Sequence, residues 1–497
     1  MLQLIQNARH HPERMAVISD GQSYSYKDLL SASAQVATAL LQGKTDLAET
    51  RVAFMIAPGF DYVRIQWGIW RAGGIAVPLS LSNPLPAQEY VLRDADCSIL
   101  IADDDYQSFL APLTEESGIR CISMAGLTGQ TETISLPDID KSRRAMIIYT
   151  SGTTGQPKGV VTTHQNIESQ ISTLVSAWGW SADDCILNVL PLHHVHGVIN
   201  VVACALWSGA CCVFVKKFEP EEVMRLLTEG NVNLFMAVPT IYYKLINYWS
   251  QLDTGAQHSI KTELSKFRLM VSGSAALPVS VMEQWQTISG QRLLERYGMT
   301  EIGMAISNPY SGERRAGHIG QPLPGVEIRI VDEHGHKVQG STSGEIQVKG
   351  PNVFKEYWKK PEATAGAFTA DGWFRTGDVA CLNEGSYRIL GRMSVDIIKS
   401  GGYKISALEI EEVLRTHPQI NDCGVVGIPD PEWDEIIGAS LILKENEEVD
   451  FEALKIWLKE RLPVYKVPRK YLIQKELPRN AMGKVTKKEL KALFTEL

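Results

Sequence analysis

Apolar residues along most of the chain alternate between two spacings. The segments 26–41 and 61–72 carry apolar residues at helical spacing, whereas 51–55 and 74–78 are short apolar runs of strand length. Further runs of the same kind are found at 99–102, 145–149, 234–237 and 269–272. Strands that alternate with helices in this way predict an α/β fold with parallel sheets covered on both faces.

The pattern changes near residue 325. Short strands are expected at 326–331, 344–349 and 386–390, separated by glycine-rich turns, which predicts a small β-barrel-like subdomain at about 325–391. The remaining segment has its own predicted helices (406–416 and 451–461) and strands (423–428 and 439–443). We therefore expect a large N-terminal domain (1–391) of mixed and parallel sheets with flanking helices, followed by a small α+β domain at 392–497.

Composition excludes several classes of protein. The net charge of −8 argues against a general nucleic-acid binder, because phosphate contacts need a basic surface. The uncharged stretch 198–215 is interrupted by Ser208-Gly209, so a buried helix (about 197–207) and a buried strand (about 210–215) explain it better than a membrane span.

Cysteine usage and the N-terminus bear on location. The eight cysteines lack metal-ligand spacing, and the N-terminus lacks an apolar signal segment. Both observations favour reduced thiols in a reducing compartment. A bacterial cytoplasm is the simplest case, and a processed organellar enzyme is the alternative. Oligomeric state is left open by the sequence.

The segment 149–159 (YTSGTTGQPKG) follows an apolar run and is dense in serine, threonine and glycine. Glycines let backbone N–H groups approach phosphate oxygens, and hydroxyl groups add donors. It does not match the GxxxxGK[ST] phosphate loop, and a run of these residues alone could equally be a surface turn. The complete string resembles the signature loop of the adenylate-forming superfamily, which includes acyl-CoA synthetases, luciferases and peptide-synthetase adenylation domains. The resemblance implies an ATP site whose phosphate loop comprises Thr150, Ser151, Gly152, Thr153, Thr154, Gly155 and Lys158.

Further motifs of that superfamily follow in order. They are 271–278 (VSGSAALP), 295–301 (ERYGMTE), 373–378 (WFRTGD), 391–392 (GR) and 478–485 (PRNAMGKV). The resemblance implies that Tyr297 packs on adenine and that Asp378 and Arg392 contact the ribose or phosphate. It implies nucleotide contacts also for Gly273, Ser274, Ala275, Glu295, Gly298 and Met299.

The same resemblance implies the catalytic residues. Thr300 would contact the α-phosphate, Glu301 would hold Mg²⁺, and Lys484 would neutralise charge as the acid carboxylate meets that phosphate. His194 is a further catalytic candidate. An enzyme of this kind uses ATP, Mg²⁺ and coenzyme A, forming an acyl-AMP in one step and a thioester in the next.

In the superfamily the C-terminal domain is mobile and rotates between the two steps. The resemblance implies that Lys399, Gly401 and Gly402 line the thiol tunnel in the second step. The usual hinge pattern is one residue longer here, so Ser394, Val395 and Asp396 all remain candidates for the hinge.

Arg296 bears on the identity of the acid. It stands before Tyr297-Gly298, where many relatives have a small residue, and its planar charged fork matches a carboxylate. We expect Arg296 to bind a second carboxylate of the substrate, assisted by Ser274 and by His194 or His196. The surrounding residues resemble malonyl-CoA synthetases, which implies malonate or methylmalonate as the substrate.

Two alternatives remain from the sequence. If Arg296 pairs with Glu295 or Glu301, the pocket is apolar and the enzyme ligates a short- or medium-chain fatty acid or an aryl acid to CoA. A stand-alone amino-acid adenylation domain is less favoured, because no carrier domain follows.

Overall fold

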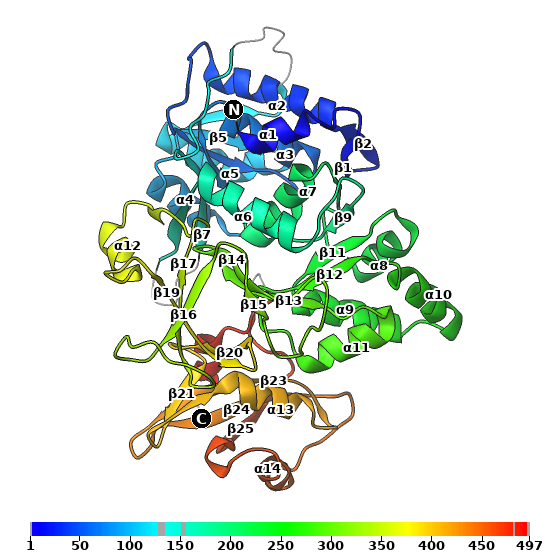
Figure 1. Cartoon of the computed structure of the whole chain (residues 1–497), viewed down its shortest axis with the longest axis vertical. Helices are drawn as coiled ribbons and strands as arrows, with labels where there is room; N and C mark the ends of the chain where they lie inside the picture. Colours follow the sequence, from blue (N-terminus) through cyan, green and yellow to red (C-terminus); the bar gives the residue numbers. More distant parts are fainter. Residues whose placement is uncertain (1, 128–134, 151–155, 481–482, 495–497) are drawn as a thin grey trace.

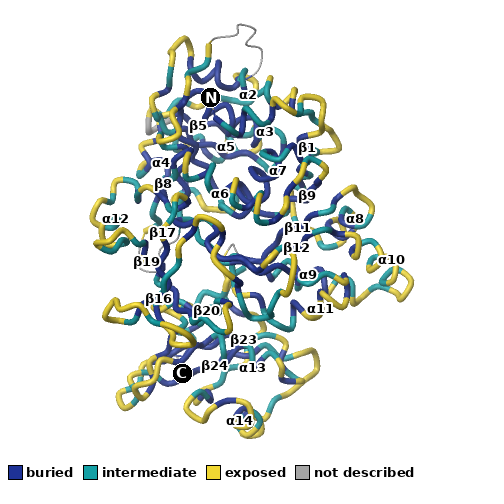
Figure 2. Tube along the Cα trace, in the orientation of Figure 1, coloured by how far each residue is buried: buried dark blue, intermediate teal, exposed yellow. Residues whose placement is uncertain are grey.

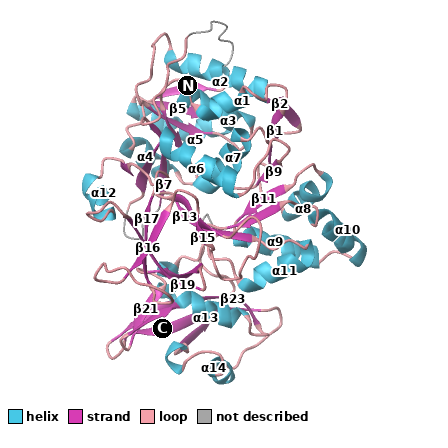
Figure 3. Ribbon diagram, viewed as in Figure 1, coloured by secondary structure: helices cyan, strands magenta, loops and turns pink. Residues whose placement is uncertain are grey.

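The computed structural model describes residues 2–127, 135–150, 156–480 and 483–494. The molecule is elongated, with the N-terminus in its upper part and the last hundred or so residues forming its lower end (Figure 1). We refer to residues up to 391 as the large part and to residues from 392 onwards as the C-terminal segment. Figure 3 shows that both contain helices and strands.

An N-terminal sheet forms the top of the large part. Its central pairs (β4–β7, β3–β4, β3–β5 and β5–β6) are parallel, whereas β8 runs antiparallel to both β7 and β18. Among the described residues its spatial order is β18 (Glu356–Tyr357), β8 (Lys158–Thr163), β7 (Arg144–Thr150), β4 (Ile75–Pro78), β3 (Arg51–Met55), β5 (Ile99–Ala102) and β6 (Arg120–Ser123).

A central sheet lies beneath it and carries most of the candidate site. Its middle strands are parallel, and antiparallel hairpins close both ends. In the described part of the chain its order is β15 (Gln321–Pro322), β14 (Gly303–Ser307), β13 (Leu294–Met299), β12 (Leu269–Ser272), β11 (Leu234–Ala237), β9 (Cys185–Asn188), β10 (Cys211–Phe214), β1 (Met15–Ser19) and β2 (Gln22–Ser25).

Helices cover both faces of these sheets, as the apolar runs predict. In β11, Leu234 and Met236 belong to the core shared by the two sheets, whereas Phe235 and Ala237 belong to a second core. Side chains alternate between faces along a strand, so a fully apolar run requires cover on both sides. The helices of the large part are α1 (Gln3–Ala8), α2 (Tyr26–Leu41), α3 (Phe60–Arg71), α4 (Leu85–Asp94), α5 (Asp104–Ser117), α6 (His164–Ala177), α7 (Cys204–Trp207), α8 (Pro220–Glu229), α9 (Pro239–Ser250), α10 (Thr254–Leu264), α11 (Val279–Ser289) and α12 (Pro361–Ala367). Figure 2 shows the buried residues concentrated in the strands between these helices.

The expected β-rich subdomain is a small antiparallel sheet. Its order is β16 (Glu327–Val331), β17 (Gly344–Lys349), β19 (Phe374–Asn383) and β20 (Ser386–Arg392). Within the described residues its edge strands β16 and β20 do not pair with each other, so the sheet is open. The predicted boundary between residues 391 and 392 falls at the end of β20 and stays a prediction.

The C-terminal segment is built around a sheet of its own. Its strands are β22 (Tyr403–Ser406), β21 (Ile397–Ser400), β24 (Asp434–Leu443), β23 (Ile420–Asp430) and β25 (Lys470–Ile473). Helices α13 (Ala407–Arg415), α14 (Phe451–Lys459) and α15 (Lys487–Leu493) complete it, and a separate apolar core lies among them. The mixed α/β architecture predicted from the sequence is therefore confirmed.

The uncharged stretch 198–215 is a helix followed by a strand, as expected. The helical portion divides into a π-helical segment, η2 (His196–Ala203), and α7, after which β10 enters the central sheet. None of the described helices is both long enough and apolar enough to cross a bilayer.

Candidate active site

The predicted phosphate loop connects two paired strands. Thr150 ends β7 and Lys158 begins β8, and these two residues face each other in the antiparallel register. The predicted contacts of Ser151, Gly152, Thr153, Thr154 and Gly155 lie outside the described residues. The Lys158 ammonium group lies 5.0 Å from the centre of the Tyr357 ring, so the loop's cation is held over an aromatic face.

Thr300 and Glu301 lie in the turn between β13 and β14. Glu301 is 6% exposed, and its Oε1 accepts a hydrogen bond of 2.9 Å from the Tyr357 hydroxyl. Burial raises the pKa of Glu301, although the hydrogen bond from Tyr357 opposes this. Tyr357 therefore lies between the predicted phosphate-loop lysine and the predicted magnesium ligand.

Tyr297, Asp378 and Arg392 come together from three strands. The Tyr297 hydroxyl donates to Asp378 Oδ2 at 2.6 Å, and Arg392 Nε donates to Asp378 Oδ1 at 2.9 Å. A bulge in the β13–β14 pairing lies between Tyr297 and Gly298, and such bulges re-aim side chains. The three residues assigned to adenine and ribose thus form one hydrogen-bonded unit, bordered along β13 by Met299.

The predicted adenine wall follows β12. Ser274 has a φ of +69°, a left-handed conformation that is unusual for a residue other than glycine, and Ala275 is half-buried beside it. Glu295 lies behind this segment, where its Oε1 accepts the backbone N–H of Leu277 at 3.0 Å. Burial raises the pKa of Glu295 to about 8, so this carboxyl holds its proton more readily than usual.

Arg296 is 3% exposed and lies against the backbone of the adenine wall. A Cβ atom at Gly273 would stand 2.5 Å from the guanidinium carbon, so only glycine permits this contact. Arg296 Nη2 is 3.5 Å from Ser274 Oγ, and Nε has no hydrogen-bond partner among the described residues. Burial lowers the pKa of Arg296 to about 9, which expresses the cost of a positive charge in this position.

The two acids considered as partners of Arg296 make other contacts. Glu295 accepts the backbone N–H of Leu277. Because successive side chains of a strand point to opposite faces, the Glu295 side chain points away from that of Arg296. Glu301 binds Tyr357. Within the described residues Arg296 forms no ion pair with either of them.

His196 joins the same cluster. It is 2% exposed, its Nδ1 lies 3.2 Å from Ser274 Oγ, and its Nε2 has no partner among the residues described. Burial, followed by repulsion from Arg296, lowers the pKa of His196 well below its usual range, so the ring is neutral. The cluster therefore combines one buried cation with polar atoms that have no partner in the described part of the chain.

Lys484 reaches this site from the C-terminal segment. Desolvation by the surrounding protein lowers the pKa of its ammonium group, with Arg392 and Arg296 repelling it and Asp378 attracting it, although the residue keeps solvent access. Burial lowers the pKa of His194 to about 3, and the charge of Lys484 contributes to that shift. Lys484 thus acts electrostatically on the nucleotide unit and on the histidine cluster.

Lys399, Gly401 and Gly402 lie elsewhere, in and beside the β21–β22 hairpin of the C-terminal segment. All three are exposed, and Gly401 donates its N–H to the backbone carbonyl of Trp433 at 3.0 Å. Among the described residues no hydrogen bond or ion pair joins them to the cluster around Arg296. Their role in thiol binding stays a prediction.

Sequence reasoning did not find Tyr357. It lies in the two-residue strand β18, which pairs with β8 and so lies beside the phosphate loop although it is far away in sequence. A single tyrosine carries no signal of such a pairing.

The chain is also similar to known proteins. A family model described as "AMP-binding enzyme" matches residues 4–358, and one described as "AMP-binding enzyme C-terminal domain" matches residues 409–484. A malonate–CoA ligase of Xenopus laevis, named as mitochondrial, is 45% identical over 97% of this chain and 90% of its own length.

Solved structures are similar as well. ATP-bound MatB from Rhodopseudomonas palustris has a TM-score of 0.92 and 31% identity, covering 100% of this chain and 99% of that chain. The apo form of the same protein has a TM-score of 0.83 at the same identity and coverage. Because the first family model spans well over half of the sequence, the chain belongs to the AMP-binding enzyme family.

Proposed function

We propose that this protein is an AMP-forming acid–thiol ligase that converts malonate, ATP and CoA to malonyl-CoA, AMP and pyrophosphate. Relatives named malonate–CoA ligase at 40–45% identity over nearly the whole chain support the malonate assignment. No described helix could span a membrane. A cytoplasmic location stays a prediction, since the Xenopus laevis relative is named as mitochondrial.

Arg296, which is buried and forms no ion pair within the described residues, carries the proposal. A buried charge without a counter-ion is strongly destabilising, whereas a bidentate carboxylate at the guanidinium removes that cost. Burial raises the pKa of Glu295 to about 8, although the charge of Arg296 opposes this, so Glu295 offers less counter-charge than an ordinary glutamate. A substrate carboxylate that does not react would complete the pair, and malonate has one such group.

In the first step a malonate carboxylate oxygen attacks the α-phosphorus of ATP. The bond from that phosphorus to the bridging oxygen breaks, and pyrophosphate leaves. We assign nucleotide orientation to Tyr297, Asp378 and Arg392, and stabilisation of the developing negative charge to Lys484. Positioned positive charge of this kind is the main resource for such transfers.

Glu301 fits a magnesium ligand. Mg²⁺ is commonly held by one or two carboxylates together with substrate phosphates, and the described residues offer no cluster of three or more metal-ligating side chains. When bound with ATP, Mg²⁺ would neutralise phosphate charge. Tyr357 would hold the Glu301 carboxylate in place through its hydrogen bond.

In the second step the thiol sulfur of CoA attacks the acyl carbonyl carbon. The bond to the AMP phosphate oxygen breaks, AMP leaves, and the thiol proton passes to solvent. The neutral His194 and His196 can accept or donate hydrogen bonds at the acyl group without adding charge. We assign the approach of CoA to the face around Gly401-Gly402.

Pyrophosphate release with a panel of acids tests the proposal. Malonate should exceed acetate, butyrate and coumarate clearly, with methylmalonate measured alongside to test room for one methyl group. A chain that prefers butyrate or coumarate would be a fatty or aryl acid ligase, and the malonate assignment would be wrong.

A further inference from the structure

The C-terminal segment touches the large part through a contact at the start of a helix. Glu412 of α13 accepts a hydrogen bond of 3.1 Å at Oε2 from the backbone N–H of Val279. Val279 is the first residue of α11, and a helix N-terminus presents unpaired N–H groups and partial positive charge. A carboxylate in this position therefore attracts the C-terminal segment to the large part, close to the adenine wall.

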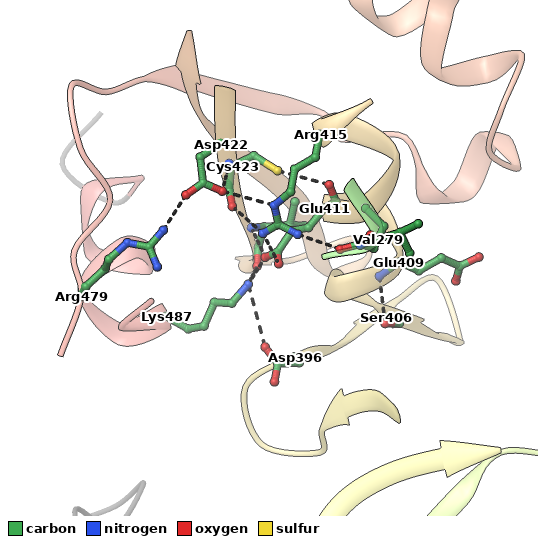
Figure 4. Close-up of polar contacts among 12 residues, drawn as sticks. Val279, Asp396, Ser406, Glu409, Glu411, Arg415, Asp422, Cys423, Arg479 and Lys487 are labelled. Carbon is green, nitrogen blue, oxygen red and sulfur yellow. Dashed lines mark hydrogen bonds and ion pairs between the residues drawn. The ribbon is translucent and has the colours of Figure 1, made fainter. Parts of the chain in front are cut away.

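Arg415 fixes the orientation of Glu412. Its Nη1 lies 3.0 Å from Glu412 Oε1, while its Nε binds Asp422 Oδ1 at 3.2 Å. The Arg415 side chain is largely buried and also lies 3.4 Å from Glu411. Figure 4 shows Arg415 beside Glu411 and Asp422, with Val279 nearby. The ion pairs of Arg415 therefore hold the Glu412 carboxylate in the orientation in which it binds α11.

The network continues to the loop that carries Lys484. Arg479 binds Asp422 at 2.5 Å (Figure 4). It also donates through Nη1 to the carbonyl of Gly483 at 2.6 Å. Gly483 itself packs on the large part, where an added Cβ would stand 2.8 Å from Thr240 Oγ1. A chain of contacts thus runs from α11 to the residue that precedes Lys484.

Lys487 of α15 also contacts this network. It pairs with the buried Glu411, donates to the carbonyl of Val425 at 2.7 Å and lies 3.9 Å from Asp396. Asp396 accepts the backbone N–H of Arg392 at 3.0 Å. The same group of charged residues therefore contacts both the junction at Arg392 and the loop that carries Lys484.

We propose that Glu412 is a positioning residue for adenylate formation: by binding the Val279 N–H, it sets the C-terminal segment in the orientation that brings Lys484 to the α-phosphate. This inference rests on the proposed function, because it assigns Glu412 to the first of the two steps. The second step does not need the positive charge of Lys484 at that phosphate.

The test compares the two half-reactions in full-length Glu412→Gln. Malonate-dependent pyrophosphate release should fall about tenfold, because glutamine keeps an acceptor oxygen but loses the charge that strengthens the hydrogen bond. Thioester formation from supplied malonyl-AMP and CoA should stay within about twofold, a split that general destabilisation cannot produce.

Val279→Pro removes the donor instead of the acceptor. Proline is well tolerated at the first position of a helix, and the preceding Pro278 already has an extended backbone with a ψ of 134°. This variant should reproduce the Glu412→Gln defect. The double variant should be no slower in pyrophosphate release than the slower single variant, because Glu412→Gln removes the charge from the contact whose donor Val279→Pro removes.

Glu409→Gln is the matched control. Glu409 lies on the same helix but pairs with Lys466 inside the C-terminal segment, at 2.7 Å. Pyrophosphate release should be unchanged in this variant.

Three results would overturn the inference: unchanged pyrophosphate release in Glu412→Gln, equal loss of both half-reactions, or additive losses in the double variant. If the unaltered chain activates another acid in place of malonate, the comparison is made with that acid and its adenylate. The assignment of malonate and the role of Glu412 therefore fail separately.

Discussion

At the scale of single residues, the proposed selection of the acid depends on Arg296. Its guanidinium lies against the backbone at Gly273 and forms no ion pair within the described residues. The sequence pointed to this residue because a permanently charged side chain is costly in a pocket without a partner. It could not reveal Tyr357 or Glu412, whose contacts with Glu301 and Val279 depend on which distant segments meet.

Replacing Arg296 separates recognition from structure. In Arg296→Ala, kcat/KM for malonate should fall by about 30-fold or more, equivalent to the roughly 2–5 kcal/mol lost when one member of a buried charge pair is removed. Residual acetate turnover should change little, because acetate has no second carboxylate. The kcat/KM of Arg296→Lys for malonate should lie between those of the unaltered protein and Arg296→Ala, since an ammonium cannot make the bidentate contact. Equal losses for malonate and acetate would show that Arg296 is structural.

At the scale of elements, apolar pattern was a good guide wherever both faces of a strand are buried. The run 234–237 coincides with β11, and the run 99–102 coincides with β5. The π-helical winding of η2 could not be predicted, because periodicity over eight residues does not separate it from an α-helix. The open small sheet was also not predictable, because closure depends on pairing between its edge strands.

Glu295 links two elements and makes stability depend on pH. It joins β13 to the segment before α11 through the N–H of Leu277, and its pKa is raised to about 8 by burial. The folded state therefore binds this proton more tightly than the unfolded state, and the stabilisation is lost as pH rises from about 4.5 through 8. Glu295→Gln keeps the acceptor oxygen but cannot ionise. Its unfolding temperature should exceed that of the unaltered protein by a margin that grows as pH rises. Thermal melts at pH 5, 6.5 and 8 measure this margin, and a constant margin would contradict the prediction.

At the scale of the whole molecule, the candidate site draws on two separately packed parts. The C-terminal segment has its own core, yet Lys484 influences groups that belong to the large part. Motif order along the sequence placed Lys484 in the C-terminal segment, and its catalytic role stays a prediction. The docked orientation could not be predicted, because it depends on contacts such as Glu412 with Val279.

Lys484→Ala tests the role of the docked arrangement. The rate of malonate-dependent pyrophosphate release should fall about 10²–10³-fold, which corresponds to a barrier higher by about 2.7–4 kcal/mol. This is the effect of removing one donor to a developing negative charge. Malonyl-CoA formation from supplied malonyl-AMP should be retained. Loss of both activities would contradict the assignment of Lys484 to the first step alone.

The close approach of Gly273 to Arg296 links two positions far apart in the sequence. Any side chain at 273 would displace the guanidinium, so neither position can change freely while the other keeps its present role. A lineage that moved from a dicarboxylate to a simple acid would lose the arginine first, and only then could a larger residue arise at 273. Across the family, arginine at the position of Arg296 should therefore covary with glycine at the position of Gly273. That pair of residues would identify diacid ligases from sequence data alone.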